Sequence, residues 1–414
     1  MKTTKNLNQW WNQFPSKLRR ITICRVLASI GAGGVLYLTP LVFNNLSFSA
    51  TEIGLGFCIA AIAGTITRLA TGIWIDKGIG FEVALKIGAI FAIIADLLLL
   101  TAYTNISYLA GELFLGAAAG IYWPSVEIAI PISCEEGHSN SSKGFALART
   151  ADALGVTIGV IIGSISASLG NIRSIYIIEI LCMCALISLL NITNSPGKSL
   201  QRLEPSGQEY KGGLRYKLSE IINLLKLLLP ILIISLLGTG ILSLMQIGIQ
   251  LDLVKGGIVR PEVTSSFVGL IVAYKLILLL FVQWPIGKWL SQKNVIVGLT
   301  LSNINFLVGC LILSISSFYS SGIFLILLGL IPISIGIAMF LPTATEAIVR
   351  IAPKKKRGLA LAIYSQCFGI SFLVFPLIAG NIIDNQGNAM MLWFMMAVFC
   401  LLVNPIIKQI RPIS

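Results

Sequence analysis

Long apolar runs separated by short polar segments recur along the whole chain. The runs cover residues 21–43, 51–73, 83–103, 107–130, 144–167, 172–192, 227–250, 264–288, 294–315, 321–343, 357–380 and 389–408. Each has about the 20 residues that an α-helix needs to cross a bilayer. Because the apolar residues do not alternate with polar ones, the pattern favours helices over a barrel. The sequence therefore predicts an all-α polytopic membrane protein with twelve transmembrane helices.

Composition supports this fold class. Hydrophobic residues make up 56% of the 414 residues and charged residues only 11%, and the mean hydropathy is +0.89. A soluble domain carries about 25% charged residues, so this chain has too few to cover a water-exposed surface. The run that begins at residue 21 is as long as a span and lacks a small-residue cleavage site. We therefore expect it to remain as the first span.

The formal net charge of +13 raises the question of nucleic-acid binding, but the positions of the basic residues argue against it. With the N-terminus placed inside, the basic residues of the inner side include Lys2, Lys5, Lys17, Arg19, Arg20, Lys77, Lys86, Lys143, Lys288, Lys293, the run 354–357, Lys408 and Arg411. The opposite side receives only Arg173, Lys255 and Arg260. This bias predicts two cytoplasmic termini and basic patches next to anionic lipid. We expect the inner membrane of a bacterial-type cell and no nucleic-acid partner.

The two halves of the chain carry similar motifs. The Gly-x-Trp-aliphatic pattern at 72–75 returns at 287–290, and the Gly-x-Ala-Leu-Ala pattern at 144–148 returns at 358–362. Because the two shifts are nearly equal, the chain is expected to be a duplicated membrane unit. The predicted organisation is a cytoplasmic lead at 1–20, a six-helix half at 21–192, a cytoplasmic linker at 193–226, a second six-helix half at 227–408 and a cytoplasmic tail at 409–414.

Several kinds of catalytic chemistry are disfavoured. His138 is the only histidine, so Ser-His or Cys-His catalysis and histidine metal sites are nearly excluded. The eight cysteines fall mostly within the apolar runs and lack metal-binding spacing. Residues 196–199 match the tail of a phosphate-binding loop, but Ile192 stands where its first glycine must be. We therefore expect no enzyme, no ATP-driven pump, no cofactor and no metal.

Charged residues interrupt the apolar runs, where a charge costs at least about 2.5–3.5 kcal/mol at the bilayer centre. Those deeper in the runs are Asp96, Glu112, Asp152, Glu179 and Lys275, and those nearer the inner surface are Arg25, Arg68, Glu127, Arg149 and Glu346. A buried carboxyl group can exchange protons near neutrality, which proton coupling requires. The alternative is that acids and bases pair to hold the helices together, as the inner group can do in one network with Asp76. Arg25 can equally extend its charge to the headgroups.

The segment at 68–80 contains the end of the second run and the connection to the third run. It combines a small-residue helix end with Asp76, Lys77, Gly78 and Gly80. The two glycines allow the backbone angles that a short reversal needs. The segment predicts a tight hairpin with charge at the bend, and a solvated turn without function is the plain alternative.

The pattern Gly72-x3-Asp76-Lys77-x-Gly80 resembles the Gly-x3-Asp-Arg/Lys-x-Gly-Arg signature of the major facilitator superfamily. Two six-span halves, an inner linker and a weaker copy of the signature at 287–293 are similar to the same family. The resemblance implies that Asp76 latches to the inner end of the eleventh span, near Gly358, in the outward-open state. The residues expected to take part in gating are Gly72, Asp76, Lys77, Gly80, Arg68, Glu127 and Arg149.

Four positions depart from the pattern of that family or of its subgroups. Phe81 and Glu82 follow the hairpin glycine where the family has basic residues. Glu112 stands where many proton-coupled members carry an arginine, and Val160 stands where drug/proton antiporters often have a proline. The departures at Glu112 and Val160 weaken an assignment to proton-driven drug export and leave the fold unaffected.

The resemblance implies a secondary active transporter that moves a small organic solute by alternating access through a mid-membrane cavity. The candidate substrate or ion-coupling residues are Asp96, Glu112, Tyr122, Trp123, Asp152, Glu179, Gln246, Lys275 and Gln366. Arg25 and Lys275 suit an anionic solute, whereas the acids suit a proton or a cation. We expect a monomer whose transport is coupled to an ion, with H+ as one candidate, and multidrug-type efflux is one of the two directions considered. The alternative is a transporter-fold receptor or assembly factor, which shows no solute flux.

Overall fold

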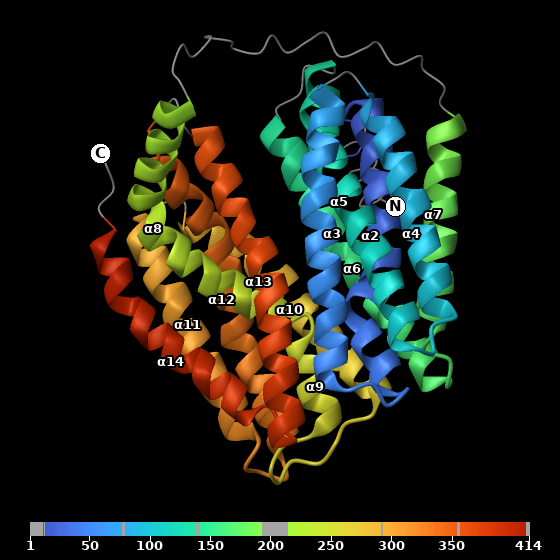
Figure 1. Cartoon of the computed structure of the whole chain (residues 1–414), viewed down its shortest axis with the longest axis vertical. Helices are drawn as coiled ribbons and strands as arrows, with labels where there is room; N and C mark the ends of the chain where they lie inside the picture. The colour runs from blue at the N-terminus through green and yellow to red at the C-terminus, as the bar shows by residue number, and fades with distance from the viewer. Residues whose placement is uncertain are drawn as a thin grey trace, which may run out of the picture. The chain divides into compact units, whose positions relative to one another are not determined.

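The computed structural model describes residues 11, 13–76, 79–136, 141–192, 214–290, 293–353 and 357–410. All regular structure in these residues is helical (Figure 1). Twelve of the described helices are long and apolar enough to cross a membrane, so the predicted fold class is confirmed. The protein is therefore an integral membrane protein.

The first six spanning helices are α2 (Ser16–Asn44), α3 (Ala50–Asp76), α4 (Phe81–Leu100), α5 (Asn105–Glu136), α6 (Ser141–Ser168) and α7 (Ser174–Ile192). The last six are α8 (Leu214–Leu244), α10 (Ser265–Leu290), α11 (Val295–Ser316), α12 (Gly322–Ile351), α13 (Arg357–Gln386) and α14 (Met390–Gln409). The short helix α9 (Gly248–Lys255) lies between α8 and α10.

The largest differences from the predicted boundaries concern α8. Residues 214–226, expected in the linker, form the first turns of this helix, and the rest of the linker at 193–213 lies outside the described residues. The helix ends at Leu244, six residues before the predicted end of the run. A turn at 245–247 and the separate helix α9 follow. Hydropathy cannot detect this break, because α9 is itself largely buried and apolar.

The chain forms two compact units. The first comprises residues 1–42 and 59–204, and the second comprises residues 43–58 and 205–414. Helix α3 belongs to both units. Its first nine residues lie in the second unit and the rest lie in the first unit. The domain boundaries predicted above remain a prediction.

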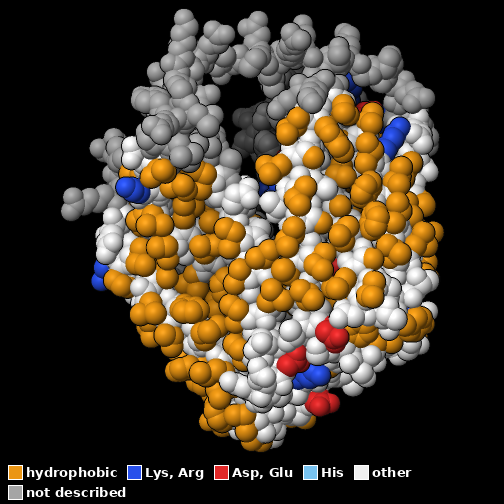
Figure 2. Space-filling view, in the orientation of Figure 1, with side chains coloured by type: hydrophobic (Ala, Val, Ile, Leu, Met, Phe, Trp, Pro, Cys, Tyr) orange, Lys and Arg blue, Asp and Glu red, His pale blue; other side chains and the backbone are white. Residues whose placement is uncertain are grey.

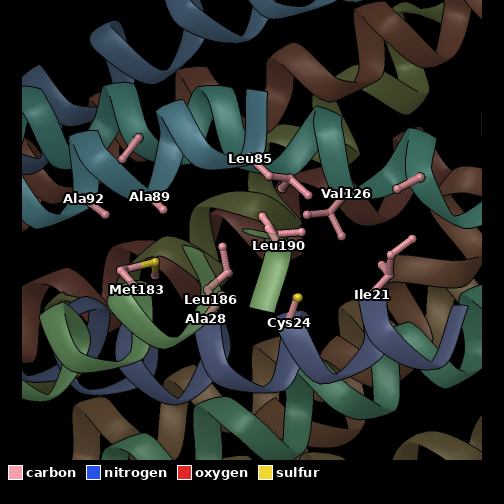
Figure 3. Packing of buried hydrophobic residues seen from close by; sticks show 12 residues of the cluster. Ile21, Cys24, Ala28, Leu85, Ala89, Ala92, Val126, Met183, Leu186 and Leu190 are labelled. Atoms are coloured by element: carbon pink, nitrogen blue, oxygen red, sulfur yellow. The ribbon is translucent and has the colours of Figure 1, made fainter. Parts of the chain in front are cut away.

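The first unit has an apolar core that α2, α4, α5 and α7 share (Figure 3). Its buried members include Ile21, Cys24, Ala28, Leu85, Ala89, Ala92, Val126, Met183, Leu186 and Leu190. Helix α4 presents Leu85, Ala89 and Ala92 at spacings of three and four residues, so they lie on one face. The small alanines allow close approach between helices, which membrane packing favours.

The outer faces of the helices are apolar as well. In the view of Figure 2, hydrophobic side chains cover much of the described surface, and most charged side chains lie toward the helix ends. Large side chains such as Ile66, Phe281 and Leu402 are more than half exposed. Such a surface fits acyl chains and does not fit water.

Glycines set the contact between α6 and α2. A Cβ atom on Gly159 would lie 2.0 Å from the carbonyl oxygen of Ile30, and one on Gly155 would lie 2.8 Å from that of Val26. Gly155 and Gly159 therefore bring the two backbones close together, which is typical of small residues spaced four apart.

Replacing Gly159 with alanine is expected to destabilise the protein by about 1–3 kcal/mol, because the added methyl group meets backbone that cannot move aside. The measurement is thermal unfolding in detergent. A thiol-reactive dye detects the unfolding, because six of the eight cysteines are buried in the folded protein. Gly287→Ala is the control, because an added Cβ there meets nothing within 4 Å. Equal melting temperatures for the two variants would contradict the packing argument.

Candidate functional site

A buried ion pair joins α2 to α6 inside the first unit. Arg25 Nε donates to Asp152 Oδ1 at 2.9 Å, and Arg25 Nη2 donates to Asp152 Oδ2. Ser29 Oγ donates to the same carboxylate at 3.3 Å. The Arg25 side chain is only 1% exposed and that of Asp152 14%. Arg25 therefore does not extend to the headgroups, and the planar fork of its guanidinium orients the carboxylate.

Two aromatic residues of α5 complete this cluster. The guanidinium carbon of Arg25 lies 5.5 Å from the centre of the Trp123 ring, within cation–π range. The rings of Tyr122 and Trp123 meet edge to face at 5.6 Å. Arg25 Nη1 and Tyr122 Oη are buried, and neither has a hydrogen-bond partner among the described residues. We name Arg25, Ser29, Tyr122, Trp123 and Asp152 the arginine cluster.

Three acidic residues lie buried elsewhere in the first unit. Asp96 on α4 and Glu179 on α7 are buried close to each other, and both carboxyl oxygens of Asp96 lack a hydrogen-bond partner among the described residues. Two ionised carboxylates so close together would repel strongly. Gly31 on α2 allows the close fit, because a Cβ there would lie 2.9 Å from Glu179 Cα.

Glu112 on α5 is the third member of this acid group. It is fully buried, and neither carboxyl oxygen has a hydrogen-bond partner among the described residues. Tyr176 on α7, which is also buried, donates to Thr39 at 3.3 Å. None of the ion pairs in the described part of the chain includes Asp96, Glu112 or Glu179.

The hairpin expected to gate the protein is partly described. Helix α3 ends at Asp76 and α4 begins at Phe81, so the tight reversal is confirmed. Gly80 has φ −61° and ψ 141°, which any residue adopts; the expectation that it needs glycine angles was wrong. Lys77, Gly78 and the Asp76 side chain lie outside what the structure describes. Gly72 and Gly80 each leave open space where a Cβ would stand.

The inner charges do not form one network among the described side chains. Arg149 pairs with Glu127 at 3.3 Å, and both are exposed. Arg68 is exposed and forms no ion pair with any described side chain, so its predicted role remains a prediction. Glu82, which replaces a basic residue of the family signature, accepts a hydrogen bond from Arg20 at 2.7 Å. The ion pair between Arg20 and Glu82 therefore joins α2 to α4.

The remaining candidates belong to the second unit. Lys275 on α10 is buried, and its Nζ donates to the carbonyl oxygen of Met245 at 3.1 Å, in the break between α8 and α9. A cation is favourable at a helix C-terminus, where carbonyl groups lack partners. Gln246 is half-buried in that break, and Gln366 on α13 is exposed. Glu346, on α12, is exposed and pairs with Arg350.

Asp252 lies in α9, and Arg260 lies in the loop that follows this helix. Both side chains are fully buried and joined at 2.6 Å, and Trp393 Nε1 donates to Asp252 Oδ2 at 2.8 Å. Burial raises the pKa of the Asp252 carboxyl, while Arg260 and Trp393 lower it again in part. Asp252 stands between Leu251 and Leu253, and Arg260 follows Val259, but the chain alone does not show that the two charges meet.

The chain has similarity to known transporters over almost its full length. The sequence model of the Major Facilitator Superfamily matches it twice, at residues 21–256 and 227–408. An uncharacterized MFS-type transporter from Methanocaldococcus jannaschii is 22% identical over 403 residues, which are 94% of this chain and 97% of that protein.

Solved structures with the same fold include two kinds of transporter. The nucleoside transporter NupG superposes with a TM-score of 0.80 at 14% identity, over 95% of this chain and 100% of that chain. A POT family transporter in complex with a thioalcohol conjugated peptide gives 0.76 at 13% identity, over 97% and 99%. At these identities the likeness extends to the fold and no further.

Proposed function

Because the chain belongs to the Major Facilitator Superfamily, we propose that it is a secondary active transporter that moves a small organic solute by alternating access and is coupled to protons. The observation that carries the coupling is the acid group Asp96, Glu112 and Glu179, which is buried and has no basic partner among the described residues. Charged carboxylates are expensive in such surroundings. These groups therefore hold protons until the cycle admits water to them.

The arginine cluster supplies the groups for the solute. Arg25 Nη1 and Tyr122 Oη are buried donors without partners among the described residues, and the Trp123 ring lies beside them. A buried donor without a partner costs about 1–3 kcal/mol, so a carboxylate, phosphate or carbonyl oxygen that accepts from it gains that energy. We infer a solute with such an oxygen and an apolar or aromatic portion. Lys275, Gln246 and Gln366 of the second unit remain candidates for further contacts.

Orientation and gating complete the proposal. The excess of lysine and arginine in alternate loops supports two cytoplasmic termini. The hairpin that contains Asp76 then lies on the cytoplasmic side, with Gly72, Lys77, Gly80, Arg68, Glu127 and Arg149 as gating candidates. A monomer in an inner membrane and efflux as one direction are part of the same proposal.

The test is solute movement by the purified protein in sealed liposomes, across organic acids, nucleosides, peptides, sugars and dyes, with and without a pH gradient. Gradient-driven accumulation of one class is expected. At least one of Asp96→Asn, Glu112→Gln and Glu179→Gln is expected to abolish the gradient-driven component, because the neutral side chain cannot release a proton.

Glu262→Gln is the matched control for these variants, because Glu262 is an exposed acid in a loop. Undiminished gradient dependence in all three variants would exclude proton coupling through the acid group. No flux of any solute, from protein with a sharp unfolding transition, would favour a receptor or assembly factor.

A further inference from the structure

The first turn of α3 has all four of its leading N–H groups occupied. Ser49 and Glu52 form a reciprocal capping box, in which Glu52 N donates to Ser49 Oγ at 3.1 Å and Ser49 N donates to Glu52 Oε2 at 2.9 Å. This arrangement leaves the N–H groups of Ala50 and Thr51 without a local partner. A second acceptor must therefore come from elsewhere in the chain.

Asp384, near the end of α13, supplies that acceptor. Ala50 N donates to Asp384 Oδ1 at 2.9 Å, and Thr51 N donates to Asp384 Oδ2 at 2.7 Å. The two residues are separated from Asp384 by more than 330 positions, yet all three lie within the second unit. A carboxylate at a helix N-terminus also meets the positive end of the helix dipole.

Around this contact, the backbone of α3 packs directly against the backbone of α13. A Cβ on Gly380 would lie 2.5 Å from the carbonyl oxygen of Ala50, and a Cβ on Gly54 would lie 2.6 Å from that of Pro376. Ala50 is fully buried, whereas Asp384 is exposed.

We propose that Asp384 is a gating residue, whose carboxylate holds the first turn of α3 on α13 in one transport state and releases it in the other. The proposal rests on the alternating-access function proposed above. Helix α3 runs from this contact into the first unit, so a movement of one unit against the other acts on it. The contact lies at the opposite end of α3 from Asp76, the residue that family resemblance makes the inner latch.

An alternative is that Asp384 is a permanent cap with a purely structural role. A permanent cap would keep Ala50 shielded from solvent throughout the cycle, whereas a latch must expose it in one state. The two roles therefore differ in the solvent access of position 50, which can be measured without knowing the solute.

The experiment measures the reaction of Ala50→Cys with a water-soluble maleimide in protein reconstituted into lipid nanodiscs, where both membrane faces are accessible. Removing the latch with Asp384→Ala is expected to speed labelling about five- to tenfold, since a capping carboxylate biases the two states by about that factor. Asn385→Ala is the matched control, because the side-chain hydrogen bond of Asn385 goes to Asn381 within its own helix. Protein without Ala50→Cys gives the background from native cysteines such as Cys184, which is exposed.

Hydrogen exchange in protein with native Ala50 provides a second measurement if Ala50→Cys perturbs the contact. Asp384→Ala is expected to release the amides of Ala50 and Thr51 to faster exchange, together with the rest of the first turn. Labelling and exchange that match the Asn385→Ala control would overturn the latch. Faster labelling combined with no solute flux would instead contradict the proposed transport function, so the two failures are distinguishable.

Discussion

Replacing Arg260 with alanine is expected to destabilise the protein by about 3–5 kcal/mol, because it leaves a buried carboxylate without its cation. Arg260 Nη2 donates to Asp252 Oδ1 at 2.6 Å and to the Asp252 carbonyl oxygen at 2.9 Å. Arg260 Nη1 donates to Ser316 Oγ at 2.6 Å. One guanidinium therefore joins α9, the loop after it and the end of α11, and Trp393 adds α14 through Asp252.

Thermal unfolding measures this effect, and Glu262→Ala is the control, because it removes an exposed charge from the same loop. The double variant Asp252→Leu with Arg260→Met is expected to recover much of the loss, since an apolar pair of similar volume often replaces a buried ion pair without penalty. An Arg260→Ala protein that melts like the control would show that the pair contributes nothing to stability.

Breaking the ion pair between Arg25 and Asp152 is expected to reduce both stability and transport. Each single variant, Arg25→Met or Asp152→Asn, removes one partner of a pair that is nearly buried. The loss of stability is about 3 kcal/mol, at the low end for buried pairs, because Asp152 is 14% exposed. Uptake of the solute identified in liposomes is expected to fall about a hundredfold, because Arg25 both orients Asp152 and presents Nη1 to the solute.

The double variant Arg25→Met with Asp152→Leu separates the two roles. Its melting temperature is expected to recover, because no unpaired charge remains, while its transport stays low. Glu127→Gln serves as the stability control, since its exposed pair with Arg149 is worth at most about 1 kcal/mol. Recovery of transport together with stability would mean that the arginine cluster is a structural element and does not contact the solute.

The sequence identified several unusual charged residues, but the structure decided how these residues pair. Asp96 and Glu179 were correctly chosen as unusual charges, but only the packed bundle brings them face to face. Asp152 pairs with Arg25 from another helix, whereas Arg149, three residues before it in α6, pairs with Glu127. Spacing along one helix fixes which residues share a face, but it does not fix which helix that face meets.

Asp384 shows the limit of local reasoning most clearly. The acid stands near a helix end in a polar stretch, which is an ordinary place for a solvated charge. The capping box of Ser49 and Glu52 is readable from the chain, but the acceptor for the two N–H groups that it leaves open is not. Tight backbone contact through Gly54 and Gly380 places that acceptor, and such contact depends on the whole packing of the bundle.

The sequence by itself determined the membrane class, the twelve helices and the resemblance to a transporter family. These properties follow from runs of consecutive residues, because hydropathy and helix length are local quantities. Only the tertiary structure decided that Arg25 pairs with Asp152, that Asp252 and Arg260 are buried, and that Asp384 caps α3. Partner choice depends on the rotation and depth of each helix against its neighbours. Rotation and depth arise from packing contacts summed over many residues, which no single segment encodes.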